Sequence, residues 1–294
     1  MSNSIAAKTG MGAVHLGVTD GSRALRFYQD TLGLKLLRTD GDTISLGAGS
    51  RELIVLHAGA ARPVVKGTTG LYHLALVLPS RRELARVVGR LISLRYPHSP
   101  TDHVMTKSDY LSDPDGNGIE VYAETPEDGS WIFENGEFLA RDSAGVLRSG
   151  RDPLDVKALL ETMTPDDRLD VPMPEGTKMG HVHLHVADLD DAIHFYHDII
   201  GFDVMGLAAS WGVGFVSAGG YHHHLGLNIW AGQDAPPSPP GAAGLRHFTI
   251  ELPTETDLQA VVTRISESGV EVSEDSYVRD PSGTVVRLHV RTSP

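Results

Sequence analysis

The chain of 294 residues contains no cysteine, which excludes a disulfide scaffold and any thiolate-ligated zinc or iron–sulfur site. Basic residues are scarce: 25 Lys and Arg stand against 38 Asp and Glu, and the formal charge of −13 argues against a nucleic-acid partner. No apolar run approaches the roughly 20 residues of a membrane span, and residues 1–10 lack a signal-peptide core. We therefore expect a cytoplasmic protein with neither a nucleic-acid nor a membrane partner.

What the chain does contain is typical of a folded protein. Hydrophobic residues make up 40% and charged residues 21% of the sequence, which is the balance of a globular chain. Its length suits one large domain or two of ordinary size. The 15 histidines are many for this length and direct attention to catalysis or metal binding. Composition leaves the oligomeric state open between a monomer and a homo-oligomer.

Internal repeats organise the sequence. Residues 13–20 (AVHLGVTD) recur without a gap as residues 181–188 (HVHLHVAD), and residues 71–79 (LYHLALVLP) match residues 245–253 (LRHFTIELP). A shared Asp-Pro-x-Gly turn lies near the end of the second and fourth copies. Such self-similarity indicates a modular architecture. The chain is thus divided into four units, near residues 12–57, 71–123, 178–231 and 244–291.

Each unit has the same predicted order of elements. An alternating strand comes first, followed by an amphipathic helix that ends at a glycine (Gly33 or Gly201) and then by short β-rich runs. This pattern predicts an α+β fold of four βαβββ modules. Modules one and two occupy residues 1–124, and modules three and four occupy residues 178–294. Between them, residues 125–177 are rich in Asp, Glu, Pro and Gly, which predicts a connecting segment with one short helix, Asp155–Met163.

Four such modules with a strand-borne histidine and the motif DPDGNGIE (residues 113–120) resemble the vicinal oxygen chelate superfamily. Glyoxalase I, bleomycin-resistance proteins and type I extradiol dioxygenases belong to it. The segment GGYHHH (residues 219–224) is similar to one in the bacterial catechol 2,3-dioxygenase group. The resemblance implies modules paired into cupped sheets around a metal, Fe(II) or alternatively Mn(II). It also implies a catechol and O₂ as substrates and a role in aromatic hydrocarbon catabolism.

The family's ligand positions can be followed through the repeat. Pairing modules two and three completes two histidines and one carboxylate, His73, His181 and Glu120, which is the facial triad of non-haem Fe(II) sites. The other pairings lack a ligand or place a cation at the carboxylate position. Modules one and four would then form a second half with a degenerate site. Its residues at the aligned positions are Ala13, His247 and Arg287.

The resemblance also implies groups that handle protons and substrate. His223 fits the position of the acid/base histidine, with His224 as a register alternative that would contact substrate. Tyr110 matches the family's substrate-contacting tyrosine, and His103 resembles its substrate-poising histidine. We expect these residues to be catalytic. The remaining strand histidines His15, His183 and His185 are expected to face a polar cavity or to pair locally. The tryptophans Trp131, Trp211 and Trp230 are expected to be packing residues.

The predicted activity is Fe(II)-dependent extradiol cleavage of catechol or a substituted catechol by O₂, giving a 2-hydroxymuconic semialdehyde-type product. Two alternatives share the fold, because fold does not fix function. One is a glyoxalase- or isomerase-like metal lyase, whose site uses a fourth protein ligand from the last strand of module three. Residues 225–230 of that module contain no carboxylate, which favours the dioxygenase. The other is a metal-free resistance protein that binds a small molecule.

Overall fold

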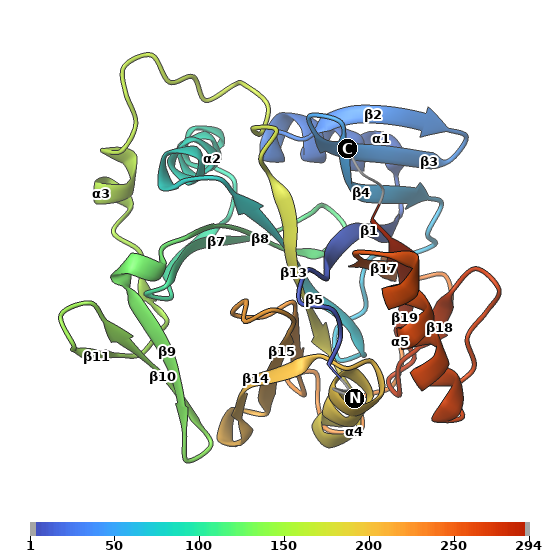
Figure 1. Ribbon diagram of the computed structural model, residues 1–294. Helices are drawn as coiled ribbons and strands as arrows, with labels where there is room; N and C mark the ends of the chain where they lie inside the picture. Colours follow the sequence, from blue (N-terminus) through green and yellow to red (C-terminus); the bar gives the residue numbers. More distant parts are fainter. Residues whose placement is uncertain (1–3, 292–294) are drawn as a thin grey trace.

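The computed structural model describes residues 4–291, in which the strands form two large curved sheets and one small sheet (Figure 1). A seven-stranded sheet has the order β18-β19-β17-β1-β4-β3-β2, and a nine-stranded sheet has the order β12-β6-β7-β8-β5-β13-β16-β15-β14. The small sheet has the order β11-β10-β9. The α+β fold with paired, cupped sheets, predicted from the sequence, is confirmed.

The first two modules follow the predicted order of one strand, one helix and three strands. Module one consists of β1 (Gly10–Val18), α1 (Gly21–Arg26) continued by the π-helical turn η1 (Phe27–Leu32), β2 (Lys35–Asp40), β3 (Thr43–Ala48) and β4 (Arg51–Ala58). Module two consists of β5 (Gly70–Leu78), α2 (Arg81–Leu94), β6 (Ser99–Asp102), β7 (Thr106–Ser112) and β8 (Gly118–Glu124).

The last two modules differ from each other by one strand. Module three consists of β13 (Lys178–His185), α4 (Leu189–Ile193) with the π-helical turn η3 (His194–Ile199), β14 (Asp203–Ala208), the 3₁₀ turn η4 (Ala209–Trp211), β15 (Val213–Ser217) and β16 (Leu225–Asn228). Module four consists of β17 (Gly244–Leu252), α5 (Glu255–Glu267), β18 (Tyr277–Arg279) and β19 (Val285–Val290). Its residues 270–276 form no strand, because acidic and serine residues favour the turn seen there.

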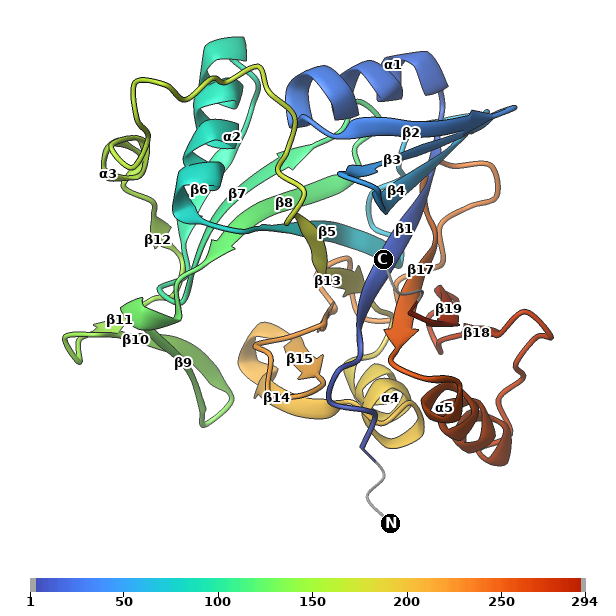
Figure 2. The ribbon, with the colours of Figure 1, turned by 45° about the horizontal axis from the view of Figure 1, so that its top comes forward.

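The sheets combine modules that are not in simple chain order. β5 pairs antiparallel with β13, so the nine-stranded sheet joins modules two and three. β1 pairs antiparallel with β17, so the seven-stranded sheet joins modules four and one. Helices α1 and α2 lie on one side of the molecule, and α4 and α5 on the other (Figure 2). None of the helices described is long and apolar enough to cross a membrane.

Local chemistry explains where the helices begin and end. Each main helix of a module starts at a polar residue whose side chain accepts a hydrogen bond from the backbone N–H three residues later: Asp20, Ser80, Asp188 and Thr254. Gly33 (φ 97°) and Gly201 (φ 102°) follow the π-helical turns in the left-handed region. Glycine adopts this conformation without the steric cost of a Cβ, as the sequence predicts at both sites.

The Asp-Pro-x-Gly turns connect one sheet to the other. The Tyr28 hydroxyl donates to Asp113 Oδ2 at 3.0 Å, and the Tyr196 hydroxyl donates to Asp280 Oδ2 at 2.9 Å. In each case the tyrosine lies on the helix of a module in one sheet, and the aspartate lies in the turn of a module in the other sheet. Both tyrosines are fully buried in a core that all four modules share. The motif is thus part of the scaffold, and its turn leads into β8.

The segment between modules two and three is more structured than a connection. It contains η2 (Pro126–Asp128), β9 (Gly129–Glu134), β10 (Glu137–Asp142), β11 (Leu147–Arg148), β12 (Asp152–Pro153) and α3 (Val156–Leu160). The helix is shorter than the predicted Asp155–Met163, and the three-stranded sheet β9–β11 was not predicted. Its aromatic residues Trp131, Phe133 and Phe138 pack with Val213 and Phe215 in a second, small apolar cluster. This packing holds the small sheet against module three.

Candidate active site

Three neighbouring strands at the centre of the nine-stranded sheet carry the predicted ligands. His73 lies on β5, Glu120 on β8 and His181 on β13. Ala75 of β5 is paired with Glu120 on one side and with His181 on the other. Paired residues face the same side of a sheet, as do residues two apart on one strand. The register therefore brings the three side chains together.

The ligand atoms of these side chains lie close enough to share one metal ion. Nε2 of His73 is 3.3 Å from Nε2 of His181, and both nitrogens are 3.1 Å from Oε2 of Glu120. Ligands at right angles on a metal, each about 2.1 Å from it, stand roughly 3 Å apart. All three side chains are buried. Two imidazoles with one carboxylate, in this arrangement, fit a divalent metal ion with open coordination positions.

The ionisation of the cluster suits the same role. Burial alone would raise the pKa of Glu120, but the charge and hydrogen bond of His181 and the contact with His73 hold that pKa well below its usual range. Burial lowers the pKa of His181. An ionised carboxylate and neutral imidazoles are the forms that bind metals.

A second group, His181 with His222 and His223, also brings three nitrogens together. Nδ1 of His222 lies 2.8 Å from Nδ1 of His223, which is a hydrogen-bond distance between the two rings. This group offers no carboxylate to balance a divalent charge, and it shares His181 with the first group. Of the two groups, the first is therefore the better match to the ligand set of a divalent metal ion.

A cavity of about 640 Å³ opens over the cluster. Its walls are largely aromatic, and all three tryptophans line it, so they do more than the packing predicted for them. The aromatic lining residues besides the histidines are Tyr72, Tyr110, Trp131, Phe138, Trp211, Phe215 and Trp230. Among the described lining residues Glu120 is the one carboxylate. A flat aromatic molecule fits such walls.

The histidine run at 222–224 divides between two cavities. His222 and His223 line the cavity over the cluster, and the ring centroid of His223 is 4.1 Å from that of His181. Nε2 of His223 is buried without a partner. Burial lowers its pKa well below the usual range, with the charges of His181 and His222 adding to the effect. In the tautomer whose Nδ1–H donates to Nδ1 of His222, Nε2 of the neutral ring is free to accept a proton.

His224 lies elsewhere, which corrects the expectation that it contacts substrate. Its Nδ1 is 2.8 Å from Ser217 Oγ and accepts a hydrogen bond from the Ala218 N–H at 3.2 Å, and its side chain lines a different cavity. His222 takes the inward place instead. The three residues precede β16 and do not form a strand, so strict alternation does not govern them.

His103 and Tyr110 form a hydrogen-bonded pair at the wall of the cavity. Nδ1 of His103 lies 2.6 Å from the Gly150 carbonyl oxygen, which can only accept, so Nδ1 carries the proton. Nε2 of the neutral ring therefore accepts from the Tyr110 hydroxyl at 2.8 Å. Tyr110 is paired across the sheet with Glu120. Burial lowers the pKa of His103 and raises that of Tyr110.

Two further residues of the cavity, Tyr72 and His183, were missed or underrated from the sequence. β5 carries one extra residue, Tyr72, between its pairs His73–His183 and Leu71–Leu184, so the pairing shifts there. Such a bulge re-aims side chains, and Tyr72 and His73 both reach the cavity. His183 is buried beside His73, with ring centroids 5.0 Å apart. Its position two residues after His181 was the available signal.

The seven-stranded sheet holds the aligned residues of the other half. His247 stacks on His15 with ring centroids 3.9 Å apart, and His15 Nδ1 is 3.0 Å from His57 Nε2. Burial lowers the pKa of His15 to about 3 and that of His247 to about 4. No carboxylate completes a ligand set among these residues.

Comparison with known proteins adds to this picture. The model of the glyoxalase/bleomycin resistance protein/dioxygenase superfamily matches residues 10–121 and 178–288. A protein of Bacillus subtilis (strain 168) named catechol-2,3-dioxygenase is 40% identical over 284 residues, which cover 95% of this chain and 96% of that protein.

Solved structures share the fold at low sequence identity. One, from Bacillus subtilis and provisionally named a dioxygenase, has a TM-score of 0.67 at 14% identity and covers 99% of this chain and 87% of its own. Glyoxalase I from Zea mays has a TM-score of 0.56 at 16% identity and covers 96% of this chain and 92% of its own.

Proposed function

This chain belongs to the glyoxalase/bleomycin resistance protein/dioxygenase superfamily, and within that superfamily we propose that it is an extradiol dioxygenase. It would cleave the ring of a catechol beside its hydroxyls, incorporate both atoms of O₂ and release a 2-hydroxymuconic semialdehyde-type product. The observation that carries the proposal is the buried His73–Glu120–His181 cluster at the base of an aromatic cavity. The likeness to a catechol-2,3-dioxygenase over almost the whole chain supports it.

His73, Glu120 and His181 would hold the metal ion, Fe(II) or alternatively Mn(II). The bound metal supplies the Lewis-acid and redox chemistry that lets a catechol react with O₂. The aromatic walls bury the ring of the substrate and exclude water from it.

Two groups of this chain are placed to move protons. The free Nε2 of His223 faces the same cavity as the cluster and can take a proton from the substrate side and return it later. The Tyr110 hydroxyl donates to His103, which leaves its oxygen able to accept a hydrogen bond from a catechol hydroxyl. A proton that enters there has His103 Nε2 as its acceptor.

The lining of the cavity favours this reaction over a metal lyase with a fourth protein ligand. β16 contains no Asp or Glu, and Glu120 is the one acidic residue among the described lining residues. Three protein ligands leave positions for both a chelating catechol and O₂.

The test is metal analysis of anaerobically purified protein, followed by O₂ uptake with catechol and detection of the ring-opened product. Glu120→Ala should lose the bound metal and the activity while the fold survives, because the change removes one ligand and leaves the sheet pairing intact. Metal retained at full stoichiometry in this variant would contradict the ligand assignment.

His247→Ala is the matched control, because His247 occupies the aligned position in the other half of the molecule. It should leave metal content and turnover near those of the wild type. If His247→Ala abolishes metal binding, the metal belongs to the other sheet and the proposed site is wrong.

A further inference from the structure

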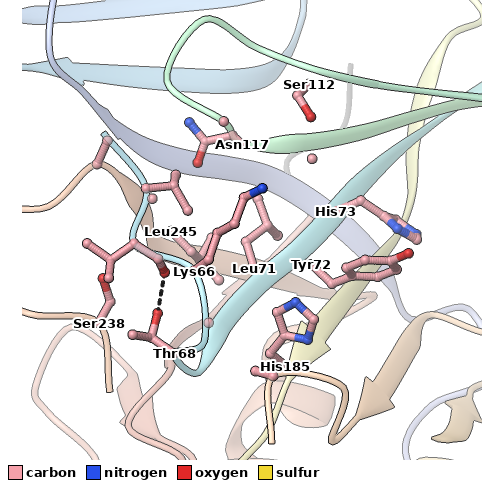
Figure 3. Close-up of a pocket in the computed structure, with 18 of the residues that line it drawn as sticks. Lys66, Thr68, Leu71, Tyr72, His73, Ser112, Asn117, His185, Ser238 and Leu245 are labelled. Atoms are coloured by element: carbon pink, nitrogen blue, oxygen red, sulfur yellow. Dashed lines mark hydrogen bonds between the residues drawn. The ribbon is translucent and has the colours of Figure 1, made fainter. Parts of the chain in front are cut away.

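Figure 3 shows a second cavity, of about 700 Å³, which shares part of its lining with the first. Four residues line both cavities: Tyr72, His73, Tyr110 and Trp230. The rings of Tyr72 and Trp230 meet edge to face with centroids 5.2 Å apart, and they form part of the wall between the two spaces. A molecule held at the metal cluster therefore lies next to this second space.

The cover of the second cavity is built by two connectors that lie far apart in the chain. Residues 59–69 join modules one and two, and residues 231–243 join modules three and four. The Thr69 N–H donates to the Pro236 carbonyl at 2.9 Å, and the Ala243 N–H donates to the Arg62 carbonyl at 2.8 Å. Residues 231–243 are rich in proline and therefore stiff, and these hydrogen bonds tie residues 59–69 to them.

The charge of the second cavity is opposite to that of the whole chain. Its described lining residues include no Asp or Glu, although the chain contains 38 of them. Lys66 is the lining residue with a permanent positive charge, and Figure 3 shows it extending from the connector into the cavity. Within residues 4–291 its amine forms no hydrogen bond or ion pair.

An unpaired polar atom also belongs to the lining of this cavity. Asn117 is 2% exposed, and its Nδ2 donates to Asp113 Oδ2 at 2.8 Å, so the amide orientation is fixed. Its Oδ1 is left without a partner, and Figure 3 shows the side chain at the cavity. The Asn117 oxygen can only accept a hydrogen bond, so it suits a donor such as water, whereas the exposed Lys66 amine is the group of this cavity that can bind a carboxylate.

We propose that this cavity takes the ring substituent of a substituted catechol and that the substituent ends in a carboxylate bound by Lys66. The proposal rests on the proposed function, because the ring is placed at the metal cluster. Tyr72 is the element that admits the substituent. Its side chain is 39% exposed, and ring contacts with Trp230 and three histidines hold it in place. Its hydroxyl forms no hydrogen bond within residues 4–291, so a rotation of this side chain to admit the substituent would break ring contacts alone.

The test compares three substrates with the metal-loaded protein: catechol, 3-(3,4-dihydroxyphenyl)propionate and the methyl ester of that acid. The wild type should prefer the acid over the ester by about fivefold in kcat/KM, as expected for an ion pair that solvent reaches. Lys66→Gln should remove this preference and Lys66→Glu should reverse it, while kcat/KM for catechol stays unchanged. Lys35→Glu, an equal charge change at an exposed site on β2, should keep the preference.

Two results would overturn the proposal: an unchanged preference in Lys66→Glu, or the same loss in Lys35→Glu, which would trace the effect to overall charge. Anaerobic binding titration of the acid and the ester tests the carboxylate site separately from the proposed dioxygenase function. If no catechol is oxidised by the wild type, the proposed function fails. Binding that favours the acid through Lys66 would still support the site, and equal binding of acid and ester would overturn it.

Discussion

At the scale of single residues, His223 and His224 differ in what surrounds them although they are neighbours in the chain. His223 lines the cavity over the cluster with a free Nε2, and His224 is hydrogen-bonded through Nδ1 on the other side of the chain. His223→Phe should therefore keep the metal and still bind catechol anaerobically. Removing one positioned proton-transfer group typically lowers turnover by about 10²–10⁴-fold. Single-turnover mixing with O₂ measures the loss.

His224→Phe is the control for this prediction and should affect turnover little. Reversed effects in the two variants would move the catalytic role to His224. If neither variant lowers turnover, the mechanism has no proton carrier at this position and the proposed function should be withdrawn.

The His103–Tyr110 pair acts as one unit because the Gly150 carbonyl fixes the tautomer of His103. His103→Ala and Tyr110→Phe should consequently be non-additive in log kcat/KM for catechol. A coupling of about 1 kcal/mol or more is expected for two hydrogen-bonded groups in a buried site. A double-mutant cycle with metal content held constant measures it, and strict additivity would show that the two residues act separately.

At the scale of the elements, the tight packing of β16 on β13 depends on Gly226. Gly226 is paired with His183, and a Cβ built on Gly226 would lie 2.7 Å from Cγ of the His183 ring. Gly226→Ala should therefore destabilise the fold by about 1–3 kcal/mol, as overpacking in a core does. Urea unfolding measures the change.

Gly176→Ala serves as the control, because its added Cβ would come no nearer than 3.4 Å to a neighbour. Its stability should remain close to that of the wild type. In the Gly226→Ala background, His183→Ala should cost less stability than it does alone, since it removes the group that the new methyl meets. If His183→Ala lowers stability equally in the wild type and in Gly226→Ala, the new methyl group is not strained against His183.

The small sheet β9–β11, which has no clear hydrophobic pattern in the sequence, contacts His103 of the candidate site. The Trp131 indole N–H donates to the His103 carbonyl at 2.9 Å, and Gly150 lies just beyond β11. The segment thus orients His103 from two sides. Its sequence, rich in Asp, Glu and Gly, gives little sign of this, because the apolar partners of Trp131 and Phe138 come from module three.

At the scale of the whole molecule, the buried histidines set the pH dependence of stability. Burial lowers the pKa of His15 to about 3 and those of His224 and His247 to about 4, against 6.5 for exposed histidine. A histidine with a depressed pKa stabilises the fold above pH 6.5, and that contribution is lost as pH falls towards the folded pKa, because the unfolded chain binds the proton first. Metal-free protein should consequently lose thermal stability as pH falls from 7 to 4.

The Tm measured across this range checks the prediction, and His15→Gln should make its decline shallower. Gln preserves polarity without titrating, so the comparison isolates the proton. A Tm that stays constant from pH 7 to pH 4 would contradict the prediction.

The sequence was sufficient for the repeat and for the family, because both depend on local patterns. Alternation predicted the first strands, the glycines at 33 and 201 predicted the helix ends, and the copies of the Asp-Pro-x-Gly turn aligned the modules. Composition did not predict the strands of the small sheet or the missing strand of module four. Those depend on neighbours that a local pattern does not contain.

For the site, the sequence by itself predicted the candidate ligands, since at the ligand positions that the family resemblance implies only His73, Glu120 and His181 complete a two-histidine, one-carboxylate set. Only the tertiary structure decided how close they lie, because that depends on β8, β5 and β13 being neighbours in one sheet. It also decided that His222 joins His223 in the cavity while His224 does not, and that Tyr72 lies between two cavities. The physical reason is that a side chain's direction follows from sheet register and bulges, which strands far apart in the chain set together.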